Sequence, residues 1–182
     1  MQTLIFNGSP RTDGNTSAII KSILKDLKGE YQILNTYACD ISACTDCRYC
    51  WQNEGCSIKD GMQAVYDYIQ NCDNIVIASP IYFSELTGKL LDVGSRLQTY
   101  YCAEKFRKEK PIQKPKKGAV ILVGGGDGNM KKAYETACVL MNHMNCTDIY
   151  NPLFYHKTNF CDVTDDADIK AEIKNITDFL NG

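Results

Sequence analysis

The sequence lacks both a long apolar run and a strong net charge. No stretch approaches the roughly 18 apolar residues that a membrane-spanning helix requires, and 20 Lys and Arg residues nearly balance 22 Asp and Glu residues. The first apolar run, residues 3–6, stops at Asn7-Gly8 and is too short for a signal peptide. We therefore expect a cytoplasmic protein, with neither a membrane nor a nucleic acid as partner.

Two common nucleotide-binding motifs are also absent. A Walker loop requires four residues between its glycines and a lysine after the second, but five residues separate Gly8 from Gly14 and no lysine follows. The dinucleotide pattern G-x-G-x-x-G is missing, and the glycine-rich residues 124–129 do not supply it. These absences argue against ATP and against a Rossmann-type NAD site.

Cysteine, by contrast, is abundant, with ten residues. In a reducing compartment a cysteine-dense segment indicates metal binding or redox chemistry rather than disulfides. Four cysteines fall between positions 44 and 56. For the six scattered ones we expect small, buried apolar side chains; they are Cys39, Cys72, Cys102, Cys138, Cys146 and Cys161.

Apolar runs alternate with segments of helical period along the whole chain. Strands are expected at residues 3–6, 31–37, 74–79, 119–123 and 149–155, and helices at residues 15–28, 62–69, 86–97, 133–144 and 169–180. This alternation predicts a single α/β domain over residues 1–182, a doubly wound five-stranded parallel sheet with helices on both faces. A polar, cysteine-rich insertion occupies about residues 38–59. The basic residues 105–117 are expected to form a solvated loop.

The loop after the first strand is suited to phosphate. In doubly wound sheets, ligands bind beyond the carboxyl ends of the strands. This loop precedes a helix, whose first N–H groups and dipole favour an anion. The hydroxyls of Ser9, Thr16 and Ser17 can donate hydrogen bonds, and Arg11 adds positive charge. The alternative is a polar turn that only caps its helix.

Two further loops follow strands at the same expected edge. After the third strand, Pro80 stiffens the chain, Tyr82 and Phe83 offer aromatic surface, and backbone N–H groups of residues 81–84 can face a polar ring edge. Taken alone, such aromatics are more often core or interface residues. After the fourth strand, glycines at residues 124–128 permit close backbone approach to a planar ring.

These loops resemble those of a known family. Gly8-Ser9-Pro10-Arg11 and Gly14-Asn15-Thr16-Ser17 resemble the FMN-phosphate loop of the NADPH-dependent FMN reductase superfamily, and residues 79–84 with Leu86-Thr87-Gly88 resemble its isoalloxazine-binding segment. The resemblance covers residues 1–130 and implies a flavodoxin-like fold. We predict that the residues in contact with FMN are Ser9, Arg11, Asn15, Thr16, Ser17, Pro80, Ile81, Tyr82, Phe83, Ser84, Gly125 and Gly126.

The clustered cysteines have the spacing Cys44-x2-Cys47-x2-Cys50-x5-Cys56. Consecutive C-x2-C steps let several thiolates converge on one inorganic core, as in ferredoxin loops, whereas structural zinc usually uses two well-separated pairs. Residues 41–62 resemble the compact motif of the iron–sulfur flavoproteins, a branch of the same superfamily, which implies a [4Fe–4S] cluster on these four cysteines. The alternatives are free thiols without a cluster, a zinc site or a redox disulfide.

The predicted reaction is hydride transfer from NAD(P)H to FMN, with one-electron steps to the cluster; a ferredoxin-like protein could replace NAD(P)H as donor. No catalytic side chain is required, and His143 and His156 lie outside the candidate loops. The rivals are a clusterless FMN or quinone reductase, a flavodoxin-type electron carrier and a metal-stabilised binding module.

In the resembled family FMN lies at a subunit interface, and Gly88 and Gly94 permit close helix contact. We therefore expect a homodimer or a tetramer of dimers.

Overall fold

A computed structural model describes residues 1–160, 163 and 166–182 of the chain, so Cys161 lies outside the described residues. Strands and helices alternate as the apolar pattern predicts. In chain order the elements are β1 (Gln2–Asn7), α1 (Asn15–Asp26), β2 (Glu30–Asn35), η1 (Tyr49–Trp51), α2 (Met62–Asn71), β3 (Asn74–Pro80), α3 (Gly88–Ser95), α4 (Gln98–Cys102), the π-helical η2 (Ala103–Arg107), β4 (Lys116–Val123), α5 (Lys131–His143), β5 (Cys146–Ile149), β6 (Leu153–Tyr155) and α6 (Ala167–Asn181).

The strands form one parallel sheet in the order β2-β1-β3-β4-β5, with β6 also paired to β4. This is the flavodoxin-like order. The expected fifth strand is present as two segments, β5 and β6, and Pro152 stands between them. Because proline has no N–H to donate to β4, the ladder breaks there and resumes at Leu153, opposite Ile121.

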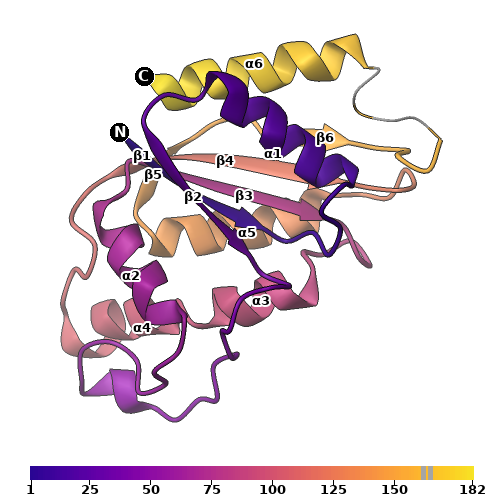
Figure 1. Ribbon diagram of the computed structural model, residues 1–182. Coiled ribbons are helices and arrows are strands. Elements are labelled where there is room, and N and C mark those ends of the chain that lie inside the picture. Colours follow the sequence, from indigo (N-terminus) through magenta and orange to yellow (C-terminus); the bar gives the residue numbers. More distant parts are fainter. Residues whose placement is uncertain (161–162, 164–165) are drawn as a thin grey trace.

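Helices cover both faces of the sheet, α1 and α6 on one face and α2, α3, α4 and α5 on the other (Figure 1). Alternate residues of each central strand enter opposite cores: Ile75 and Ile77 face the four-helix side, whereas Val76 and Ala78 face α1 and α6. Burial on both faces explains why these strands are continuously apolar. The cysteine-rich insertion lies outside the sheet, next to α4 (Figure 1).

The region after β3 differs most from the expectation. The single helix predicted at residues 86–97 is followed directly by α4 and η2. The basic segment therefore begins in a helical turn and ends in β4, where Lys116 is buried. Gly94 is buried, and an added Cβ would lie 2.9 Å from Leu140 of α5. Its small size therefore serves packing within the chain, whereas Gly88 faces open space. Across the residues that the structure describes, no helix is long and apolar enough to cross a membrane.

Candidate functional site

Three loops converge on one pocket at the carboxyl ends of β1, β3 and β4. The pocket is lined by Ser9, Pro10, Arg11, Gly14, Asn15, Thr16, Pro80, Ile81, Tyr82, Val123, Gly125, Thr158 and Asn159. Eight of the twelve predicted FMN contacts are among these residues. Ser17, Phe83, Ser84 and Gly126 are not.

The loop after β1 is held by its own hydrogen bonds. The Gly8 N–H donates to the Ala78 carbonyl at 2.8 Å, and the Thr87 hydroxyl donates to the Gly8 carbonyl at 2.8 Å. The Ser17 hydroxyl donates to the Arg11 carbonyl at 2.7 Å, so Ser17 shapes the loop instead of lining the pocket. Gly14 precedes α1 and has no side chain to cap it, which leaves the first N–H groups of the helix directed at the pocket.

The loop after β3 contains a tight turn. Tyr82 and Glu85 exchange two backbone hydrogen bonds of 3.0 and 3.1 Å, and the central residues Phe83 and Ser84 have φ values of 54° and 61°. Such a left-handed pair is the geometry of a type I′ turn. Ile81 donates its N–H to the Val123 carbonyl. Of the four N–H groups expected to face a ligand, only those of Phe83 and Ser84 have no backbone partner in the described residues.

A fourth segment, which the sequence analysis missed, completes the pocket. After β6, the Lys157, Thr158 and Asn159 N–H groups donate to the carbonyls of residues 126, 124 and 125, at 2.8, 3.1 and 3.3 Å. Thr158 and Asn159 thereby reach the pocket wall. Both are polar residues that follow β6, and a strand of only three residues shows no clear apolar pattern in the sequence.

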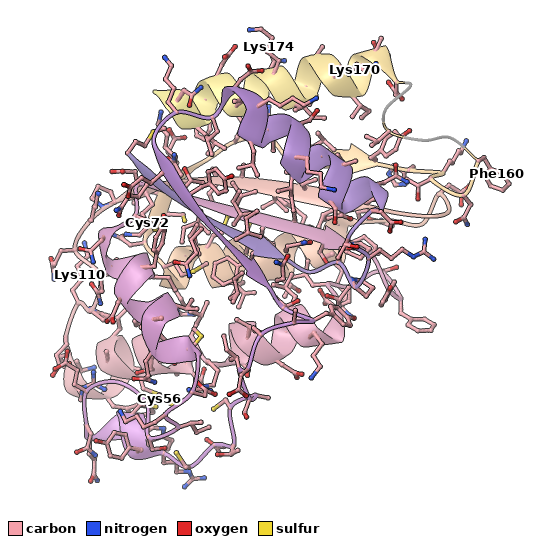
Figure 2. The ribbon with its side chains drawn as sticks, viewed as in Figure 1. Cys56, Cys72, Lys110, Phe160, Lys170 and Lys174 are labelled. Atoms are coloured by element: carbon pink, nitrogen blue, oxygen red, sulfur yellow. The ribbon has the colours of Figure 1, made fainter. Side chains whose placement is uncertain are left out.

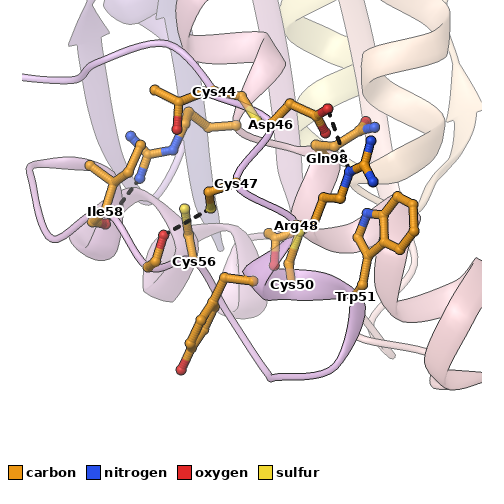
Figure 3. Close-up of a pocket in the computed structure, with 14 residues that line it drawn as sticks. Cys44, Asp46, Cys47, Arg48, Cys50, Trp51, Cys56, Ile58 and Gln98 are labelled. Carbon is orange, nitrogen blue, oxygen red and sulfur yellow. Dashed lines mark hydrogen bonds and ion pairs between the residues drawn. The ribbon is translucent and has the colours of Figure 1, made fainter.

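The four clustered cysteines surround a second pocket, with Arg48 and Trp51 beside it (Figure 3). Asp46, Arg48 and Gly55 have φ values of 51°, 60° and 75°, and these left-handed positions turn the backbone sharply between successive cysteines. The loop is tied to its surroundings at Cys44, whose N–H donates to Ser95 Oγ at 2.9 Å, and at Cys50, whose carbonyl accepts from Arg107.

The cysteine thiols differ in their acidity. Cys47 is exposed, and a hydrogen bond with the Ser57 hydroxyl, 3.1 Å away, holds the pKa of its thiol below the ordinary value. Burial and the adjacent Cys102 thiol raise the pKa of Cys50 to about 12. The Cys47 thiol therefore loses its proton more readily than the Cys50 thiol.

The cysteine pocket has little free space and, in the part of the chain that the structure describes, no preformed site for a single metal ion. Among the described residues no three His, Cys, Asp or Glu side chains are placed to share one metal ion. A cluster binds each cysteine at a different iron atom and thus needs more widely spaced sulfurs. The free space between the side chains is about 20 Å³, so cluster binding requires the cysteine side chains to move apart within the backbone frame.

The pocket at the ends of β1, β3 and β4 and the cysteine pocket are separate, but both are connected to α3. At its start, Thr87 binds the loop after β1; at its end, Ser95 binds Cys44. The eight residues of α3 span about 12 Å, so these two contacts lie at opposite ends of one short helix. Figure 2 shows Cys56 and Phe160, the neighbour of Asn159, at opposite ends of the molecule.

The scattered cysteines are only partly as expected. Cys72, Cys102 and Cys146 are buried, which confirms the prediction for these three. Cys39 and Cys138 are only partly buried, so for them the prediction of full burial is wrong.

The sequence matches the family described as NADPH-dependent FMN reductase over residues 1–159. The chain belongs to this family. Membership places it among the flavin-dependent oxidoreductases and confirms the resemblance seen in the loops.

Two of the relatives of this chain are named iron–sulfur flavoproteins. One, from Methanocaldococcus jannaschii, is 30% identical over 128 residues, which cover 69% of this chain and 62% of that protein. Another, from Methanosarcina thermophila, is 26% identical over 135 residues, or 72% and 68% of the two chains. This chain thus spans less than two thirds of the length of the Methanocaldococcus protein.

Solved structures share the fold. An NAD(P)H:quinone oxidoreductase from Methanothermobacter marburgensis has a TM-score of 0.74 at 14% identity, covering 100% of this chain and 98% of the other. An FMN-dependent NADH-azoreductase from Bacillus anthracis has a TM-score of 0.68 at 14% identity and full coverage of both chains. These likenesses confirm the flavodoxin-like α/β fold of this FMN reductase family member.

Proposed function

We propose that this protein is an FMN-dependent oxidoreductase that takes electrons from NAD(P)H or from a ferredoxin-like protein and passes them on through a [4Fe–4S] cluster. The observation that carries the flavin half is the convergence of the loops after β1, β3 and β4 on one pocket. The cluster half is supported by the four cysteines around one pocket and by the relatives named iron–sulfur flavoproteins.

The residues present fit the phosphate of FMN. The uncapped start of α1 offers backbone N–H groups and the positive end of the helix dipole. Arg11 is exposed at the pocket and supplies a full positive charge. Thr16 is 2% exposed on the first turn and presents its hydroxyl at the same place. Together these groups suit a phosphate dianion better than an uncharged ligand.

The turn at Phe83 and Ser84 follows the pocket-lining residue Tyr82 but does not itself line the pocket. In this proposal its two N–H groups, which have no backbone partner among the described residues, face the pyrimidine side of the bound flavin ring, where such donors stabilise negative charge. Tyr82 lines the pocket beside them and offers an aromatic face. Bound FMN would supply a hydride acceptor that can also release electrons singly. The chain's own part is to bind, orient and electrostatically support it.

The cysteine residues fit an iron–sulfur cluster by their chemistry, because thiolates are the ligands that such clusters prefer. In this proposal Cys44, Cys47, Cys50 and Cys56 are the four ligands. We further propose a homodimer or a tetramer of dimers, on the basis of the family resemblance.

The test is anaerobic purification followed by a visible spectrum, iron and acid-labile sulfide assays and FMN titration. We expect stoichiometric FMN, about four irons per chain and loss of the iron, but not of FMN, in Cys56→Ser. A protein that binds FMN but no iron would contradict the cluster and support the alternative of a clusterless reductase. A protein that takes up neither FMN nor iron would contradict the whole proposal. Turnover with NAD(P)H separates an enzyme from an electron carrier.

A further inference from the structure

A buried arginine lies beside the cysteine pocket. Arg96 follows α3 and is 1% exposed, yet it lines the same pocket as the four cysteines. Its N–H donates to the Val93 carbonyl at 3.0 Å, and its carbonyl accepts from the Tyr66 hydroxyl at 2.8 Å. The main chain therefore holds this cation in place.

The Arg96 guanidinium ties together both ends of the cysteine loop. Nη1 donates to the Ser42 carbonyl at 2.9 Å and to Asp60 Oδ2 at 2.7 Å. Nη2 donates to the Ile58 carbonyl at 3.1 Å (the dashed line at Ile58 in Figure 3). Ser42 stands two residues before Cys44, and Ile58 stands two residues after Cys56. One side chain thus closes the loop from both sides.

One nitrogen of the Arg96 guanidinium donates no hydrogen bond among the described residues. Its Nε is buried and has no hydrogen-bond partner within residues 1–160, 163 and 166–182. A buried donor without an acceptor costs free energy, and the pocket that Arg96 lines is rich in sulfur.

We propose that Arg96 is a positioning residue of the iron–sulfur site, which orders the cysteine loop before the cluster binds and donates its Nε–H to a sulfur of the bound cluster. This inference rests on the cluster half of the proposed function. A hydrogen bond donated to a cluster sulfur favours the more negative, reduced cluster, so this contact raises the reduction potential. Lysine cannot replace it, because an ammonium group lacks the planar fork that reaches three acceptors at once.

The test compares three variants with the wild type. Arg96→Lys keeps the charge and loses Nε–H. Arg96→Gln combined with Asp60→Asn removes the guanidinium together with its counter-charge, so no buried carboxylate is left unpaired and the net charge does not change. Lys89→Gln, which removes an exposed cation of α3 that does not line the cysteine pocket, is the control. For each protein, hydrogen–deuterium exchange of residues 42–58 is measured without the cluster, and the midpoint potential is measured by EPR-monitored titration after anaerobic reconstitution.

We expect faster exchange of residues 42–58 and a more negative midpoint in both Arg96 variants, and neither change in Lys89→Gln. If the midpoint potential is the same in the wild type and in the Arg96 variants, the inference is wrong and the proposed function stands. A wild type that takes up FMN but no iron overturns the inference together with the cluster assignment.

Discussion

Arg96 Nη1 and Asp60 Oδ2 lie 2.7 Å apart in an ion pair whose side chains are 0% and 9% exposed. The same carboxyl group accepts hydrogen bonds from the backbone N–H groups of Ser42 and Met62, each at 3.0 Å. The pair therefore joins the start of α2 to the entrance of the cysteine loop. Because a buried charge is costly to leave unpaired, the stability of this region depends on both partners.

Replacing Asp60 with asparagine is expected to lower the free energy of unfolding by about 3 kcal/mol at pH 7, since it leaves Arg96 buried without a counter-charge. Urea unfolding of the cluster-free protein measures this. Asp178→Asn removes an exposed i,i+4 partner of Lys174 and should cost less than about 0.5 kcal/mol. Equal costs for the two variants would contradict a structural role for the buried pair.

The same pair predicts a pH dependence. Burial raises the pKa of Asp60, but hydrogen bonds from Arg96, Ser42 and Met62 outweigh burial and hold the pKa below its ordinary value. A carboxyl group of lowered pKa contributes its full stabilisation above its unfolded-state pKa of about 3.9, and this is lost as the pH falls through the folded-state value. The stability difference between wild type and Asp60→Asn should therefore be constant from about pH 5 to pH 7 and shrink below about pH 4. A difference that grows on acidification would refute this assignment.

Phe83→Asn is expected to stabilise the flavin-free protein by about 1 kcal/mol, because left-handed backbone is unfavourable for phenylalanine and tolerated by asparagine. Phe83 is fully exposed at a φ of 54°, so little packing is lost. Phe160 is 87% exposed and outside the left-handed region; Phe160→Asn should bring no gain. Chemical unfolding of both variants decides the matter, and stabilisation by both would show that exposure, not backbone strain, is the cause.

In the cluster-free protein, Cys47 is expected to react with iodoacetamide at least about tenfold faster than Cys50 near pH 8, because the thiolate is the nucleophile. The pKa of Cys47 lies below its usual value, and that of Cys50 is raised to about 12. Mass spectrometry of labelled peptides gives the two rates. Ser57→Ala should slow Cys47 and leave Cys50 unchanged; an unchanged Cys47 rate would show that the Ser57 hydroxyl does not stabilise the thiolate.

Arg11→Gln is expected to weaken FMN binding about tenfold or more, the loss of one charge-assisted hydrogen bond. Riboflavin lacks the phosphate, so its affinity should not change. Lys25→Gln removes a positive charge from the exposed far end of α1 and serves as control. Fluorescence quenching titrations measure all the affinities. Equal losses for FMN and riboflavin would place Arg11 near the ring instead of the phosphate.

Much of this protein could be predicted from local sequence. Side-chain periodicity is a local property of the sequence. The continuous apolar runs of β3 and β4 therefore predict strands buried on both faces, and the helical period of α1 predicts a helix with one buried face. The loop at Gly8–Ser17 and the spacing of Cys44, Cys47, Cys50 and Cys56 likewise carry their chemistry within a few residues.

Other features were decided only by the tertiary structure. Three of them depend on contacts between distant segments: the position of β1 between β2 and β3, the addition of Thr158 and Asn159 to the pocket at the ends of β1, β3 and β4, and the position of Arg96 beside cysteines some 40 or more residues earlier. Nothing in the neighbouring residues of Arg96 shows that its charge is buried against Asp60. Periodicity indicates which face of an element is apolar, whereas the partner of that face is chosen by the packing of the whole chain.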